Sequence, residues 1–242
     1  MNRRSAAPAL QSAQRPSIEA VEADDFSVAE VLTDGLRSWL SQLPSFAGVA
    51  LILHAPLLLI ILLPPLPGPL AAAIFLAAEL VVALLVKATL IKAVLDARRG
   101  LPADFAELLG ALRNGPGVVT LGVRILARAA GRLLLVMPGV MYLAETFAAV
   151  PALLVEGGSG GKALARSRQL TEGVRFGVLT ICLLIWSAAI GLTLLSGVYK
   201  AESLSNPTWI VVYLCTRALD TSLAAVICAT AYHHLSERPE AA

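Results

Sequence analysis

Three arginines lie four residues apart within an otherwise apolar stretch: Arg124, Arg128 and Arg132. Residues at this spacing share one face of a helix, so the sequence predicts a stripe of guanidinium groups along a segment that is long enough to enter a bilayer. An unpaired arginine near the membrane midplane costs about 2.5–3.5 kcal/mol on insertion scales. We therefore expect these side chains to have partners or water.

Carboxylates in other apolar segments are the candidate partners of the arginine stripe. They are Glu79, Glu145 and Asp220. At about 1.5 Å per residue, Glu79, Arg128 and Asp220 are expected near the midplane, with Arg132 and Glu145 toward the outer side. Arg217 lies one turn from Asp220 and is a second candidate partner for it. Two interpretations stay open, a polar cavity for an anionic headgroup or solute and a structural ion-pair network with snorkelling arginines.

A second group of cations follows Glu156-Gly157-Gly158, where the chain is expected to leave the membrane. Its members are Lys162, Arg166, Arg168 and Arg175. The residues from Lys162 to Glu172 form a predicted basic helix at the membrane surface, where each cation near anionic lipid is worth about 1 kcal/mol. The helix is a candidate for lipid-headgroup contacts, and control of membrane topology is the alternative interpretation.

No pattern in the sequence predicts catalysis, a metal site or a bound cofactor. The three cysteines lie in apolar segments without metal-ligand spacing, and Ser167 lacks the sequence context of a nucleophile elbow. His54 stands alone in an apolar run and is expected to be a packing residue with one hydrogen bond. The formal charge of +2 is scattered, whereas nucleic-acid binding needs clustered cations. We expect a protein that is not an enzyme and binds no nucleic acid.

The elements that must position these residues are membrane helices. Hydrophobic residues make up 57% of the chain and charged residues 15%, with a mean hydropathy of +0.76. A soluble domain carries roughly 25% charged residues, so the sequence predicts an all-α integral membrane protein. Residues 1–25 are expected to form a disordered cytoplasmic tail, 26–235 a single membrane domain and 236–242 a second tail. Six apolar stretches are predicted spans: about 44–63, 70–95, 117–136, 140–155, 174–198 and 208–232.

Amphipathic segments precede three of the predicted spans, at 26–43, 102–115 and 162–172. The positive-inside rule places the loops that contain Arg98, Arg99 and the basic helix in the cytoplasm, whereas the opposite side offers only Lys200. Both termini are then cytoplasmic, and we expect the bacterial inner membrane. Residues 117–155 are the ambiguous part, because they could form two full spans or a partly inserted hairpin.

Leu32-Thr33-Asp34-Gly35-Leu36-Arg37 recurs as Leu170-Thr171-Glu172-Gly173-Val174-Arg175, and a weaker copy runs from Ala106 to Arg113. These matches favour a unit of one amphipathic helix and one membrane hairpin that is used three times. A chance match of six residues is the alternative explanation.

The central stretch carries Pro138-Gly139-Val140-Met141-Tyr142-Leu143, then Pro151 to Gly157, then Ala163-Leu164, Ser167, Leu170-Thr171 and Gly173. This pattern resembles the bacterial membrane-domain family that is fused to glycerophosphodiester phosphodiesterases, and the similar stand-alone YciC-like membrane proteins. The resemblance implies a membrane module without the catalytic domain. That domain resembles a TIM barrel, which needs about 250 residues of its own.

These observations lead to two functional hypotheses. The first is a non-enzymatic membrane protein that supports lipid or envelope organisation, or the assembly of a membrane complex, with membrane lipids and a membrane protein as partners. The second is a small permease, or a lipid or anion transporter, that uses the arginine stripe.

Overall fold

The computed structural model describes residues 26–61, 68–100, 115–133, 136–196 and 207–238, and every regular element in these ranges is an α-helix. The helices are α1 (Val28–Ser41), α2 (Leu43–His54), α3 (Pro56–Ile61), α4 (Gly68–Arg98), α6 (Gly115–Leu133), α7 (Val136–Thr146), α8 (Ala149–Glu156), α9 (Gly160–Thr171), α10 (Arg175–Ser196) and α11 (Pro207–Ser236). The expected tail 1–25, the amphipathic segment that starts at Pro102 and the loop with Lys200 lie outside the described residues.

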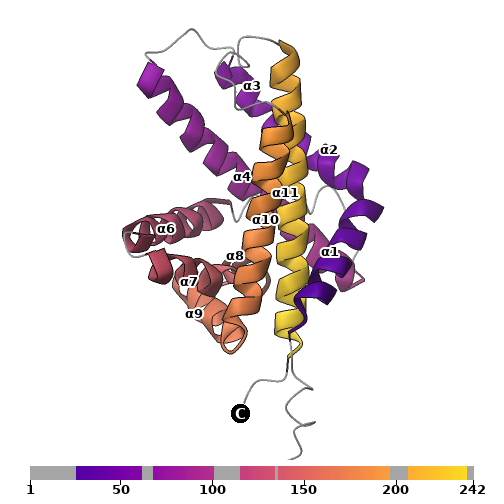
Figure 1. Ribbon diagram of the computed structural model, residues 1–242, viewed down its shortest axis with the longest axis vertical. Coiled ribbons are helices and arrows are strands. Elements are labelled where there is room, and N and C mark those ends of the chain that lie inside the picture. The colour runs from indigo at the N-terminus through magenta and orange to yellow at the C-terminus, as the bar shows by residue number, and fades with distance from the viewer. Residues whose placement is uncertain (1–25, 62–67, 101–114, 134–135, 197–206, 239–242) are drawn as a thin grey trace, which may run out of the picture.

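Helices α4, α10 and α11 form the long part of the molecule (Figure 1). Glu79 of α4 contacts Arg217 of α11, and Arg98 contacts Thr230 further along both helices, so α4 and α11 run in the same direction. Helix α11 presents Ala225 and Ala229 to the core, in the cluster that also contains Val86, Leu90 and Val94 of α4. Small residues at such positions let two helices approach closely, which strengthens packing within a membrane.

Helices α1 and α2 meet at an angle of 79° and run along α11 in the opposite sense. Ser27 caps α1 by accepting a hydrogen bond from the Glu30 amide. The Trp39 indole donates to Ser222, and Asp34 contacts His234 nearer the end of α11. The predicted amphipathic helix at 26–43 is therefore confirmed as a helix, and tertiary contacts attach it to the bundle.

Helices α6 to α9 lie beside the lower half of α10 and α11, and α6 extends sideways from the bundle (Figure 1). Helix α4 ends at the same end of the bundle at which α10 begins. Three contacts show this: Arg98 to Thr230, Glu156 to Tyr232, and Glu145 to Arg175. The chain between α4 and α10 therefore leaves and returns at one end of the bundle.

Four helices are long and apolar enough to cross a membrane, or five if the bent pair 28–41 and 43–58 is one span, among the residues described. They are Ala73–Arg98, Pro138–Glu156, Arg175–Ser196 and Thr208–Ser236. The prediction of six spans is not confirmed, since α6 does not qualify. The candidate span Pro138–Glu156 consists of α7 and α8, which are separated by a turn at residues 147–148. Glu145 of α7 and Glu156 of α8 both contact the same end of the bundle.

The proposed threefold repeat is also not confirmed. In the first copy Gly35 lies inside α1 and packs against Ile227. In the second copy α9 ends at Thr171, and Gly173 has a φ of +81° in the turn that follows. The third copy lies outside the described residues. The same letters thus occupy a helix interior in one place and a helix end in the other.

Candidate functional site

Arg124, Arg128 and Arg132 are all exposed on one face of α6. Apolar residues of α6 such as Val118 and Leu121 are buried in the protein, and Leu121 lies one turn before the exposed Arg124. Gly122 leaves room for this packing, because a Cβ at that position would lie 2.6 Å from Cδ1 of Leu84 in α4 and would force the Leu84 side chain to shift. The sequence therefore predicts the arginine face correctly, but tertiary packing turns that face outward and the apolar face inward.

The three arginines do not pair with the expected carboxylates. Arg124 and Arg128 form no ion pair with a described residue, and Arg132 places its guanidinium carbon 4.2 Å from the centroid of the Tyr142 ring. The expectation that Glu79, Glu145 or Asp220 would neutralise this stripe is therefore wrong for the described residues. The three exposed guanidinium groups, which we call the arginine face, can bind anions such as phosphates.

Glu145 instead binds two cations of the basic segment. Its carboxylate lies 3.5 Å from Arg168 Nε and 3.3 Å from Arg175 Nη1. The Ser167 hydroxyl donates to the Glu145 carbonyl at 2.7 Å, which adds a buried link between α7 and α9. Glu145 therefore fixes the basic helix to the end of the bundle and pairs with none of the three stripe arginines.

The other end of the basic segment is also attached. Arg166 Nε donates to Glu156 at 3.0 Å, and the Tyr232 hydroxyl donates to the same oxygen at 3.1 Å. Lys162 is exposed near the start of α9, where Ser159 caps the helix by accepting from the Lys162 amide. Of the four predicted headgroup contacts, Arg166, Arg168 and Arg175 thus hold α9 in place, whereas Lys162 makes no side-chain ion pair with a described residue.

A separate polar cluster lies between α2, α4 and α11. Arg217 Nη2 is 2.6 Å from Glu79 Oε1, and Arg217 Nη1 is 3.2 Å from Asp220 Oδ2. The predicted pairing of Arg217 with Asp220 is confirmed, and the contact with Glu79 joins α4 to α11. Glu79 lies 11 residues after the start of α4 and Arg217 10 residues after the start of α11. Both are therefore about 15 Å along their helices, at a similar level of the bundle.

His54 and Tyr213 complete this polar cluster, and sequence reasoning did not assign them to it. His54 is 0% exposed and contacts the Ala50 carbonyl through Nδ1 at 2.7 Å, the single hydrogen bond that the sequence predicted. A carbonyl can only accept, so Nδ1 carries a proton, and Nε2 of the neutral ring is an acceptor. His54 Nε2, Tyr213 Oη and Arg217 Nε are all buried without a hydrogen-bond partner among the described residues.

The spacing of Tyr213, Arg217 and Asp220 was a signal for this cluster, because residues at i, i+4 and i+7 share one helix face. His54 had no comparable signal, since its neighbours come from other helices. One acceptor, His54 Nε2, and two donors, Tyr213 Oη and Arg217 Nε, remain without a partner among the described residues. They belong to the same cluster as the ion pairs of Arg217. Buried polar atoms of this kind normally have partners, so the cluster is suited to hold water or a small polar group.

Within the ranges that the structure describes, no group of three His, Cys, Asp or Glu side chains could hold a metal ion. Comparisons of the chain with protein-family models, with curated proteins and with solved structures find no match. The resemblance of residues 138–173 to the membrane-domain family therefore stays a prediction.

Proposed function

We propose that this protein is a non-enzymatic integral membrane protein that gathers anionic lipid at one face of the bilayer and so supports lipid or envelope organisation. The observation that carries the proposal is the arginine face. Arg124, Arg128 and Arg132 are exposed in a row, and no carboxylate among the described residues neutralises them. Each such cation near a surface of anionic lipid is worth about 1 kcal/mol.

The placement in the membrane follows from the same geometry. We place α4, α10, α11 and the α2–α3 segment across the bilayer, and α6 to α9 at its inner surface. Support comes from the common end at which α4 finishes and α10 starts, and from the cations gathered there: Arg98, Arg99, Lys162, Arg166, Arg168 and Arg175. The positive-inside rule makes this end cytoplasmic. Both termini then face the cytoplasm, and we place the protein in a bacterial inner membrane.

This arrangement has four crossings in place of six, made by the α2–α3 segment, α4, α10 and α11. Helices α6 to α9 form an insert at the surface between the second and third crossings. It explains why α6 can be amphipathic, since a helix at the interface needs only one apolar face. It also leaves large hydrophobic side chains of α10, such as Leu184, Ile190 and Leu195, exposed toward lipid or toward a membrane-protein partner.

The polar cluster favours a second candidate function, a small permease or an anion transporter. Its support is the set of buried atoms on His54, Tyr213 and Arg217 that have no partner among the described residues, within the candidate spans of α4 and α11 and beside α2. In this form of the hypothesis the transported group would contact Arg217 rather than the arginine stripe. Anion uptake into vesicles that contain the purified protein tests it, and uptake that is unchanged in Arg217→Met would count against the cluster.

The lipid proposal is tested by changing Arg124, Arg128 and Arg132 to Gln together. Purified protein is incorporated into nanodiscs of phosphatidylcholine with increasing phosphatidylglycerol, and bound phosphatidylglycerol is measured by native mass spectrometry. Three cations at about 1 kcal/mol each predict a loss of up to about 100-fold in preference for the anionic lipid. Salt should weaken the wild-type preference because the arginine face is exposed.

The matched control is Arg37→Gln, which removes an exposed arginine of α1. It should leave the lipid preference within about twofold of wild type. If the triple variant enriched phosphatidylglycerol as strongly as wild type, the arginine face would not be the lipid site and the proposal would fail.

A further inference from the structure

A cavity of about 260 Å³ lies between α4, α6, α10 and α11, beside the junction of α7 and α8. Its lining is almost entirely apolar, with Leu84 from α4, Leu126 from α6 and Trp186 from α10 among the walls. It is separate from the arginine face, because α6 contributes its inward side to the cavity through Gly122 and Ile125. The cavity is smaller than pockets for drug-sized ligands, which typically have about 300–1,000 Å³, so it is too small for both chains of a two-chain lipid.

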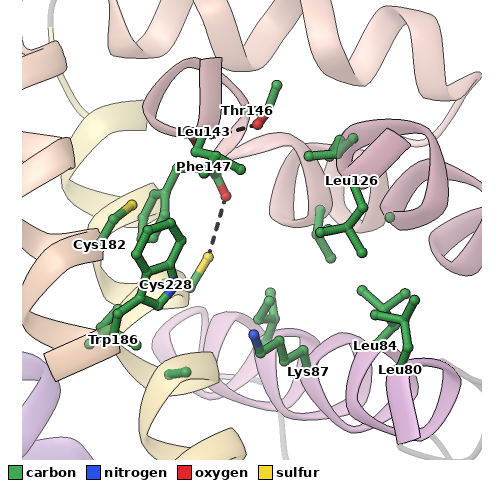
Figure 2. Close-up of a pocket in the computed structure, with 16 residues that line it drawn as sticks. Leu80, Leu84, Lys87, Leu126, Leu143, Thr146, Phe147, Cys182, Trp186 and Cys228 are labelled. Carbon is green, nitrogen blue, oxygen red and sulfur yellow. Dashed lines mark hydrogen bonds between the residues drawn. The ribbon is translucent and has the colours of Figure 1, made fainter. Parts of the chain in front are cut away.

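Among the described residues that line this cavity, Lys87 is the one with a charged side chain. Figure 2 shows its side chain rising from α4 into the space, with the nitrogen toward Cys228. The ammonium group has three donors, yet it forms no hydrogen bond or ion pair with a described residue. Asp220 lies within electrostatic range, but its carboxylate is hydrogen-bonded to Arg217. Lys87 is half-buried, so its ammonium group remains accessible to an anionic partner that enters the cavity.

The cavity lies along the middle of a helix that can cross a membrane. Its lining on α4 runs from Leu80 to Ile91, within the candidate span Ala73–Arg98. Lys87 lies 11 residues before Arg98, in the half of this span that leads to the cationic end of the bundle.

From this geometry we infer a second lipid site, in which the cavity binds a single-chain amphiphile with a carboxylate group, a long-chain fatty acid. The carboxylate pairs with the Lys87 ammonium, and the alkyl chain lies against Leu84, Leu126 and Trp186. Charge complementarity selects the acid, because an ion pair is strongest where water is scarce. The apolar walls favour an alkyl chain over a polar group of the ligand.

Trp186 makes the site measurable, because a bromine atom close to an indole quenches its fluorescence. The chain has three tryptophans, Trp39, Trp186 and Trp209, and the W39F/W209F variant keeps only the one in the cavity. This protein, in phosphatidylcholine nanodiscs, is titrated with 9,10-dibromostearic acid and with its methyl ester, both expressed as membrane-bound concentration. The W39F/W186F variant, which keeps only Trp209, measures quenching that arises from simple partition.

The acid should quench Trp186 with saturation and about tenfold more tightly than the ester, since only the acid pairs with Lys87. Lys87→Met should remove that preference, and Lys87→Arg should keep it. Lys92→Met is the matched control, because Lys92 lies on the same helix, pairs with Asp96 and does not line the cavity.

Equal quenching by acid and ester in the W39F/W209F protein would overturn the inference without requiring any change at Lys87. So would a preference that survives in Lys87→Met. Stronger saturable quenching by a dibrominated phosphatidylglycerol than by the acid would assign the cavity to a two-chain lipid and would overturn it as well. None of these results depends on the arginine face, so the two proposals can fail separately.

Discussion

Replacing Arg217 with Met should destabilise the protein strongly, because the change breaks the ion-pair cluster at the junction of α4 and α11. Arg217 binds Glu79 at 2.6 Å and Asp220 at 3.2 Å, and the three side chains are only 25%, 15% and 15% exposed. The substitution leaves two carboxylates without a cation in an apolar bundle. Removal of one partner of a buried ion pair costs about 3–5 kcal/mol. Because this cluster is partly exposed, we expect Arg217→Met to lower the free energy of unfolding by about 3 kcal/mol.

The triple variant Glu79→Gln, Arg217→Met, Asp220→Asn should behave in the opposite way. Removal of all three charges also removes their desolvation cost, so this variant should lie within about 1 kcal/mol of wild type. Thermal unfolding in detergent, followed by circular dichroism, measures both variants. For a chain of this size, a change of 3 kcal/mol corresponds to a fall of roughly 6–12 °C in the unfolding midpoint.

Arg37→Met provides the baseline, because this exposed arginine forms no ion pair with a described residue and should change stability by less than about 0.5 kcal/mol. Unfolding of Arg217→Met at the wild-type temperature would refute the assignment of a stabilising role to Arg217. Unfolding of the triple variant as early as the single one would refute it equally, because loss of charge balance would then not be the cause.

Two further predictions concern packing and a buried hydrogen bond. Gly35→Ala should lower the free energy of unfolding by about 1–3 kcal/mol, because the new Cβ would lie 3.2 Å from Cγ1 and 3.4 Å from Cα of Ile227. Gly48→Ala, which meets nothing within 4 Å, should instead raise it by about 0.5–1 kcal/mol; equal effects of the two changes would argue against close packing of α1 on α11. Ser167→Ala should cost about 1 kcal/mol because the Glu145 carbonyl loses its donor, while Ser187→Ala, whose exposed hydroxyl bonds only to its own helix, should cost less. Unfolding midpoints in detergent measure all four variants, and a Ser187→Ala effect as large as that of Ser167→Ala would contradict the second comparison.

Much of the helical framework could be predicted from the sequence, because it depends on local composition. The long apolar runs before Arg98 and after Pro207 became α4 and α11, and the predicted basic helix became α9. Three- and four-residue periodicity also identified the arginine face of α6. The pairing of Arg217 with Asp220 was predictable because the two residues are neighbours on one helix.

The partners of charged residues on different helices could not be predicted in the same way. Periodicity tells which face of a helix is polar, but the depth and rotation of each helix decide which side chain that face meets. Glu145 therefore binds Arg168 and Arg175 instead of the arginine stripe, and Glu79 binds Arg217.

By itself, then, the sequence determined a helical chain with several segments long and apolar enough to cross a membrane, the approximate ends of its long helices and the faces that carry charge. These properties follow from the composition and periodicity of single segments. Only the tertiary structure decided that α6 turns its arginines outward, that His54 joins a cluster with Arg217, and that Lys87 faces an apolar cavity. These features arise where several helices meet, and the order of residues in one helix carries no information about the others.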